Sequence, residues 1–133
     1  MEIRAYKKVD DEDKLMKMIE NEEGWTYSDN NMSEKYRIAL ENSITYVAYE
    51  GDVLCGYSRS IDDFGLYIYV CDLLVKPEYR GKNIGRKLME YLYTDYPNQI
   101  VYVMSDVDEY YKKQGYQREG SIFEVSNKGD VKS

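Results

Sequence analysis

The chain has 133 residues, of which 43% are hydrophobic and 32% charged, enough for one domain around a single core. Its net charge of −7 argues against a nucleic-acid binder, because such proteins neutralise phosphates with a basic surface. An acidic field favours a cationic small molecule or a basic polypeptide as partner, although the same charge also serves solubility alone. The sixteen tyrosines predict an aromatic core whose hydroxyl groups reach polar partners.

Several kinds of chemistry are excluded by residue type. The chain has no histidine, so Ser-His-Asp and Cys-His catalysis and histidine-bound metals are excluded. Cys55 and Cys71 lie in apolar strand-like stretches without metal-ligand spacing, and we expect no metal cofactor. No apolar run approaches the ~18 residues that span a bilayer, and residues 1–9 predict a strand rather than a secretory leader. We therefore expect a cytoplasmic protein without a membrane partner.

The first half of the chain predicts three strands and two helices. Apolar residues at helical spacing favour a helix after an acidic start, and Ser33 is a plausible N-cap for the next one. A Gly51-Asp52 turn joins two strands into a hairpin. The expected elements are a strand at 2–9, helices at 10–22 and 34–42, and strands at 44–50 and 53–61.

The second half alternates strands and helices. After a reversal at residues 62–65, the continuous apolarity of residues 66–75 predicts a strand covered on both faces. Pro77 ends it, and a helix begins near Asn83 and stops before Pro97. The remaining expected elements are a strand at 99–104, a short helix at 107–114, a strand at 116–125 and a polar tail at 126–133.

The junction YRGKNIGR, residues 79–86, has the chemistry of an anion site. The first turn of a helix leaves backbone N–H groups without partners, and the helix dipole makes that end positive. Glycines 81 and 85 let the backbone approach an oxygen closely, and Arg80, Lys82 and Arg86 add positive charge. The segment is neither a Walker A motif nor a dinucleotide fingerprint. The alternative is a basic helix start whose glycines serve packing.

The run CDLLVKPEYRGKNIGRKLMEYL resembles motif A of the GNAT N-acetyltransferases, Arg/Gln-x-x-Gly-x-Gly/Ala after a strand. Further on, YYKKQGY at residues 110–116 resembles the F-Y-x-K-x-G-F segment of that family. Together the matches cover residues 66–125. Asn83 stands where the family has glycine, but asparagine tolerates positive φ better than other non-glycine residues. We therefore expect the turn and coenzyme A binding to be retained.

The resemblance implies an α+β fold in α/β/α layers. Its mixed, mostly antiparallel central sheet would have six to seven strands, splayed at the cofactor site, with about four helices. We expect one domain over residues 1–125 and a disordered tail over residues 126–133, in a monomer or a homodimer.

The resemblance also implies acetyl-CoA as co-substrate. The strand backbone would bond the pantetheine arm, and the helix start would hold the pyrophosphate. This cofactor-binding set is Leu73, Leu74, Val75, Arg80, Gly81, Lys82, Asn83, Ile84, Gly85 and Arg86. Tyr111 matches the position that assists the departing thiolate. A tyrosine pKa of ~10 makes full proton transfer uphill, so a hydrogen bond that strengthens as charge develops on sulfur is the better description.

Without histidine, the candidate base for the acceptor amine is a carboxylate. Asp72 is expected to point into the cleft, where it acts through water or attracts a cationic acceptor. The alternative is that the strand places it on the far face, as a structural hydrogen-bond acceptor. The acceptor pocket would draw aromatic and acidic residues from two loops. These are Trp25, Tyr27, Asp62, Asp63 and Tyr69.

The predicted function is transfer of acetyl from acetyl-CoA to a primary amine of a small molecule, by direct attack in a ternary complex. Two alternatives remain: a non-catalytic acyl-CoA sensor or partner-binding module, and an N-acetyltransferase that acts on proteins or peptides.

Overall fold

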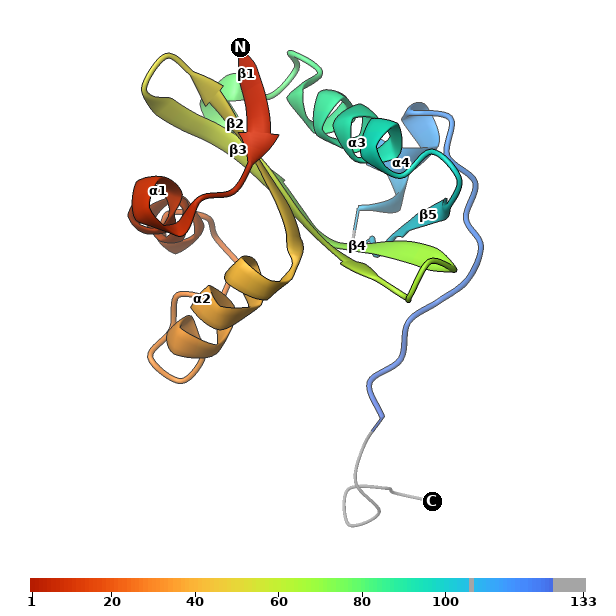
Figure 1. Cartoon of the computed structure of the whole chain (residues 1–133), viewed down its shortest axis with the longest axis horizontal. Coiled ribbons are helices and arrows are strands. Elements are labelled where there is room, and N and C mark those ends of the chain that lie inside the picture. Colours follow the sequence, from red (N-terminus) through yellow and green to blue (C-terminus); the bar gives the residue numbers. More distant parts are fainter. Residues whose placement is uncertain (106, 126–133) are drawn as a thin grey trace. The chain divides into compact units, whose positions relative to one another are not determined.

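The computed structural model describes residues 1–105 and 107–125 (Figure 1). The chain forms two compact units, residues 1–103 and the part that begins at Met104. The predicted tail at 126–133 lies outside the described residues. None of the helices in the described part has the length and apolar character needed to cross a membrane.

Residues 1–103 contain five strands and three α-helices, close to the predicted bounds. The strands are β1 (Glu2–Ala5), β2 (Ile44–Glu50), β3 (Val53–Asp62), β4 (Tyr67–Val75) and β5 (Ile100–Val103). The helices are α1 (Lys8–Glu20), α2 (Ser33–Asn42) and α3 (Ile84–Asp95), with a short 3-10 turn at Pro77–Tyr79 before α3. The second unit contains the helix α4 (Asp108–Lys113).

The strands form one sheet in the order β1-β2-β3-β4-β5. The first three pairings are antiparallel and β4–β5 is parallel, which confirms a mixed, mostly antiparallel sheet. The prediction of six to seven strands is wrong for the described residues, because 116–125 contains no strand. Gly120 interrupts that segment, and its apolar side chains Ile122, Phe123 and Val125 are at least 70% exposed. A strand there would gain no apolar burial to offset its ordering.

Helices cover both faces of the sheet in residues 1–103. Figure 1 shows α1 and α2 on one side of the sheet and α3 on the other. The first layer packs Leu15, Ile19 and Leu40 against Val47 and other strand residues, in a core that also contains several tyrosines. The second packs apolar side chains of α3 onto the opposite face. Two separate cores thus hold the sheet between its helices.

A buried acid fastens the start of α1 to the first two strands. Both oxygens of Asp11 accept from the Arg4 guanidinium at 2.8 Å, and Tyr49 donates to one of them at 2.6 Å. The backbone amide of Lys7 adds a third donor at 2.7 Å. Burial would raise the pKa of Asp11, but these hydrogen bonds outweigh it and lower the pKa below its ordinary value. The carboxylate therefore stays charged inside the protein.

We predict that Asp11→Asn lowers the free energy of unfolding by about 2–4 kcal/mol at neutral pH, because it leaves Arg4 without its buried partner. Urea denaturation followed by circular dichroism measures the loss. Since the folded pKa is depressed, the contribution of Asp11 is full above the unfolded pKa of ~4 and disappears as the pH falls below it. Asp13→Asn, at an exposed position of the same helix, is the matched control. An equal loss in both variants would contradict the prediction.

Candidate active site

The turn before α3 contains two left-handed residues. Gly81 has φ +83° and Asn83 has φ +63°, with ψ +23° at Asn83. The expectation that asparagine tolerates positive φ here is confirmed. Left-handed residues next to right-handed ones turn successive amides toward one side, which produces a concave anion-binding backbone. The chain therefore builds this turn without the usual second glycine.

The helix beyond the turn begins with open donors. The amide of Lys87 is the first to bond back, to the carbonyl of Asn83 at 3.0 Å. The amides of Ile84, Gly85 and Arg86 precede that bond, as the first amides of any helix do. In the part of the chain that the structure describes, none of these three donates to another protein atom. Three donors at the positive end of a helix dipole suit a diphosphate.

Three cations flank this turn, each with a partner. Arg80 donates from Nε to the Val75 carbonyl at 3.0 Å and forms an ion pair with Glu22 at 2.7 Å. Arg86 pairs with Glu90 on the exposed surface of α3, and the Lys82 ammonium lies 5.2 Å from the centre of the Tyr79 ring. Exposed ion pairs contribute little to the free energy of folding. The cations can therefore turn from these partners to an anionic ligand at small cost in stability.

Among the described residues, part of the β4 backbone edge beside this turn has no strand partner. The pairing of β4 with β5 covers Tyr67–Val70, whereas β4 continues to Val75. Lys76 donates its amide to Cys55 on β3, so by antiparallel alternation the backbone of Leu74 also faces β3, while Leu73 and Val75 face away. The bond from Arg80 to the Val75 carbonyl agrees with this. Of the three predicted pantetheine contacts, two therefore have outward backbone groups.

Gly56 allows the start of α3 to lie close to this edge. A Cβ at Gly56 would lie 3.0 Å from the Leu74 carbonyl oxygen and 3.3 Å from the Ile84 side chain. Ile84 and Val75 both pack on that face of the sheet. The absence of a side chain at Gly56 thus sets the distance between the amides at the start of α3 and the edge of β4.

Asp72 lies at the centre of a buried polar network. One oxygen accepts from the Tyr27 hydroxyl at 3.0 Å, and the other accepts from Tyr36 at 2.8 Å and from Arg59 Nε at 2.6 Å. The hydroxyl of Tyr57 lies 2.6 Å from that of Tyr36 and extends the network. Asp72 is 5% exposed. With both oxygens occupied, this geometry favours the structural alternative over a direct base.

The four side chains around Asp72 in this network are held in their protonated forms. Burial and the negative charge of Asp72 raise the pKa of Tyr36, and the same two causes raise that of Tyr27. Burial also raises the pKa of Tyr57 well above its ordinary value. Burial would lower the pKa of Arg59, but its contacts with Asp72 raise it overall. At neutral pH all four side chains therefore remain protonated.

The loop between α1 and α2 is fixed to this network. The Tyr27 ring stacks on Tyr36 with centroids 4.1 Å apart, and Trp25 makes edge contacts with Tyr27 and Tyr57. Both loop aromatics are partly buried against the core of that face. The structure thus brings two predicted acceptor residues, Trp25 and Tyr27, together with Asp72.

The other predicted acceptor residues lie around the reversal between β3 and β4. Asp62 accepts from the Gly65 amide at 3.0 Å and from the Gln99 side chain at 2.8 Å. The amide of Asp63 donates to the Tyr67 carbonyl, which closes the turn. Tyr69 lies in a cluster of three tyrosine rings with Tyr67 and Tyr102. These residues form a group separate from the Asp72 network.

Tyr111 belongs to the second unit. It lies on α4, is 9% exposed, and packs its ring against Tyr110 and Tyr116. Gly115, at φ +86°, follows the helix and turns the chain so that the amide of Tyr116 reaches the Tyr111 carbonyl. The predicted short helix is therefore present, and Tyr111 has a defined environment within it.

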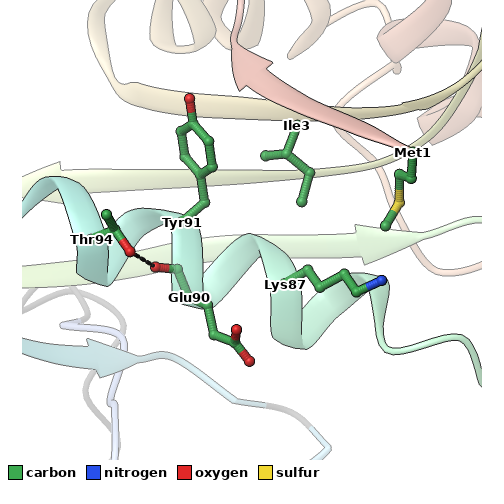
Figure 2. Close-up of a pocket in the computed structure, with 6 residues that line it drawn as sticks. All are labelled: Met1, Ile3, Lys87, Glu90, Tyr91 and Thr94. Atoms are coloured by element: carbon green, nitrogen blue, oxygen red, sulfur yellow. Dashed lines mark hydrogen bonds between the residues drawn. The ribbon is translucent and has the colours of Figure 1, made fainter.

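A further hollow of about 440 Å³ lies between β1 and α3 and contains none of the predicted site residues. Figure 2 shows its lining: Met1, Ile3, Lys87, Glu90, Tyr91 and Thr94. It is open, and the Thr94 hydroxyl is bonded to the carbonyl of Glu90. Among the described residues, no group of three or more His, Cys, Asp or Glu side chains is arranged to hold a metal.

The sequence analysis missed Arg59 and Tyr36 as partners of Asp72, Tyr57 as the partner of Tyr36, and Tyr67 and Tyr102 as neighbours of Tyr69. One signal was available. Arg59 is the only cation in the apolar stretch VLCGYSRSI, and a charge in a strand covered by helices requires a partner of opposite charge. The nearest acid in the adjoining predicted strand is Asp72. The tyrosine cluster depends on the register of β4 and β5, which no short motif encodes.

A mixed sheet whose strands β4 and β5 separate beyond Val70, with open amides at a helix start beside that edge, has the features that would suit an acyl-coenzyme A. Residues 41–118, more than half of the chain, match the acetyltransferase (GNAT) domain family. The chain therefore belongs to the GNAT acetyltransferase family, which confirms the resemblance. This family uses acetyl-CoA, so the predicted co-substrate is confirmed as well.

Solved structures support the same fold. A GNAT-family acetyltransferase of Streptococcus pneumoniae is 24% identical, with a TM-score of 0.70 over 95% of this chain and 98% of that one. The PaiA N-acetyltransferase of Thermoplasma acidophilum, solved with coenzyme A, is 19% identical, with a TM-score of 0.68 over 90% and 92%. An aminoglycoside 6'-acetyltransferase type Ii is 21% identical, with a TM-score of 0.67 over 90% and 85%. The search of curated proteins found no significant match.

We predict that Asn83→Gly retains both stability and coenzyme A binding, because glycine adopts the left-handed turn without cost. Asn83→Ala should lower the free energy of unfolding by about 1 kcal/mol and weaken coenzyme A binding, since alanine is strained at positive φ. Titration calorimetry with coenzyme A and thermal unfolding measure the two quantities. Tenfold weaker binding in Asn83→Gly would contradict a purely conformational role and show that the amide side chain contacts the ligand.

Proposed function

We propose that this protein transfers an acetyl group from acetyl-CoA to a primary amine of a small molecule, by direct attack in a ternary complex. One observation carries the proposal: the open amides of Ile84, Gly85 and Arg86 begin a helix directly beside the free edge of β4. The first feature suits a diphosphate, and the second suits the amide groups of a pantetheine chain. Family membership supports the same donor.

In this proposal each part of the donor has its own set of contacts. The pyrophosphate is bound by the backbone of residues 80–86, with Lys82 and Arg86 as added charge. The outward backbone groups of Leu73 and Val75 bond the pantetheine arm, as an added strand would. The Arg80 guanidinium already occupies the Val75 carbonyl at 3.0 Å, so we assign the pantetheine bond there to the Val75 amide.

The transfer itself forms one bond and breaks another. The neutral amine nitrogen attacks the thioester carbonyl carbon, a C–N bond forms, and the C–S bond breaks. The amine loses one proton and the sulfur gains one, which yields an amide and free coenzyme A. We propose that the Tyr111 hydroxyl donates a hydrogen bond to the sulfur as negative charge develops there. The match of YYKKQGY to the family segment supports this role.

Asp72 is proposed as a positioning residue. Its two oxygens hold Tyr27 of the α1–α2 loop, Tyr36 of α2 and Arg59 of β3. The carboxylate thereby fixes the loop that carries Trp25 against the sheet. The proton of the acceptor amine then leaves to water rather than to a side chain.

An acyl-enzyme is disfavoured. Burial raises the pKa of the Cys71 thiol, so little thiolate is present at neutral pH. Cys71 and Cys55 are both free, which fits a reducing cytoplasm where acyl-CoA is also available. We propose a cytoplasmic location because the two cysteines are free and because acyl-CoA is available there.

A thiol-release assay tests the proposal. Purified protein is mixed with acetyl-CoA and a panel of amines, and free coenzyme A is measured by a thiol reagent after subtraction of the protein's own two cysteines. Amine-dependent release supports the transferase. Coenzyme A binding without release by any amine would support the sensor alternative, and activity confined to lysine peptides would support the protein-directed one. Absence of coenzyme A binding would refute the donor site itself.

We predict that Tyr111→Phe lowers kcat tenfold or more and leaves coenzyme A affinity within about twofold, because the hydroxyl acts only as charge develops on sulfur. Tyr110→Phe, at the adjacent and partly exposed position, is the matched control and should retain activity. Steady-state kinetics and titration calorimetry separate the two effects. Equal losses of kcat and affinity in Tyr111→Phe would assign Tyr111 a structural role instead.

We predict that Asp72→Asn lowers the free energy of unfolding by about 2–4 kcal/mol, because Arg59 loses its buried partner. The acid limb of the pH profile of kcat/KM should nevertheless remain, since it reports deprotonation of the amine. Tyr27→Phe removes one donor to Asp72, retains the ring, and should preserve the same limb with a smaller loss of stability. If the acid limb disappears in Asp72→Asn, the carboxylate is the base after all.

A further inference from the structure

On the face of the sheet against which α1 and α2 pack, three half-buried tyrosine rings lie outside the core that these helices form. Tyr67, Tyr69 and Tyr102 place their ring centroids 5.4–6.2 Å apart there, with Tyr102 inclined by 31–32° to the other two. Ile61 pairs with Tyr69 across the strands and is 43% exposed. These four residues form what we call the aromatic floor.

The sheet register fixes the side to which the aromatic floor points. Ile68 and Val70 are buried in the core under α3, so the alternate residues Tyr67 and Tyr69 point to the opposite face. Tyr102 is the register partner of Tyr69 and shares that face. The core that α1 and α2 form contains none of the four floor residues within the described part of the chain. The floor is thus a part of the sheet that these helices do not cover.

The floor adjoins the place where β4 and β5 separate. Their pairing ends at Val70, and the free edge that suits pantetheine begins just beyond it. An acceptor that lies on the floor would therefore be next to the acyl end of the donor. This step rests on the proposed function.

The charges around the floor limit what can lie on it. Asp72 is paired with Arg59, whereas Asp62 accepts from the Gly65 amide and the Gln99 side chain through Oδ1 alone, and neither neutral donor cancels its charge. The carboxylate of Asp63 makes no hydrogen bond or ion pair within the described residues, so two acids without a cationic partner, Asp62 and Asp63, remain near the turn. Each ammonium that loses water needs a countercharge. A polyamine or aminoglycoside with three or more ammonium groups would need more acids than these two, whereas a monoamine needs only one.

We infer that the acceptor is a monoamine attached to an aromatic ring, with the ring stacked on the aromatic floor. Tyrosine rings present flat π faces that bind another ring in offset or edge geometry. The three hydroxyls bond no other described residue and remain available to polar substituents of the ring. The amine nitrogen acquires the acetyl group and loses one proton to water, and the coenzyme A sulfur gains one proton.

A matched set of amines tests the inference with acetyl-CoA and the intact protein. 2-Phenylethylamine and 2-cyclohexylethylamine have the same carbon skeleton and differ in aromaticity, and their kcat/KM values are compared per concentration of neutral amine, because their basicities differ as well. Spermidine and a lysine peptide represent the polycationic and protein classes. We expect kcat/KM for the phenyl compound to exceed that for the cyclohexyl compound by roughly threefold to tenfold, the range of a ring–ring contact. Spermidine and the peptide should be poorer still.

Two variants assign the preference to the floor. Tyr69→Leu and Tyr102→Leu retain apolar bulk but remove the ring, so each should reduce the phenyl preference and leave the KM for acetyl-CoA unchanged. Tyr93→Leu, on the exposed side of α3, is the control and should change neither. Survival of the full preference in both floor variants, or higher kcat/KM for spermidine or the peptide, would overturn the inference.

A binding measurement separates this inference from the proposed function. Saturation-transfer NMR detects 2-phenylethylamine on the protein whether or not it is acetylated. Ring contact that weakens in Tyr69→Leu, without thiol release from any amine, would support the floor and refute the transferase. Thiol release from other amines, without ring contact, would support the transferase and refute the floor.

Discussion

One extra residue in β4 determines to which face of the sheet the later side chains of this strand point. Arg59 pairs with Asp72 and Ser60 with Val70, so Cys71 is an unpaired bulge between them. Before the bulge, Ile68 and Val70 point toward α3, and beyond it Asp72 and Leu74 point toward α1 and α2. The same strand therefore carries apolar contacts to one layer and a buried acid to the other. Without the bulge, Asp72 would lie on the apolar face under α3, away from its three donors.

The bulge also separates the proposed donor and acceptor regions along β4. On one side, the free backbone of Leu73 and Val75 continues toward the left-handed turn at Asn83, where Gly56 lets the start of α3 approach. On the other side, the strand keeps its pairing with β5 and presents tyrosines. A donor that is recognised through backbone groups and an acceptor that is recognised through side chains can thus meet at one strand. Recognition of the donor leaves the acceptor side chains free to vary.

Most helices, strands and turns could be predicted because each is specified by the residues of its own segment. The hairpin of β2 and β3 follows from two apolar runs around Gly51-Asp52, and β2 has the predicted bounds. The turn at Gly81 and Asn83 was predictable from helix-terminus physics and from the φ tolerance of asparagine. The segment 116–125 was not, since a strand depends on a partner edge and on burial that its own residues do not specify. A short apolar run alone cannot show whether that edge exists.

The side-chain network of the candidate site could not be predicted for a related reason. Tyr27, Tyr36 and Arg59 come from a loop, a helix and a strand, and they meet only because the bulge turns Asp72 toward them. Sequence motifs record the donor site, whose contacts lie within one continuous segment. The acceptor side is assembled from distant segments through register. This difference explains why the sequence alone identifies acetyl-CoA, whereas the class of amine has to be argued from which acids are paired and which rings lie outside the packed cores.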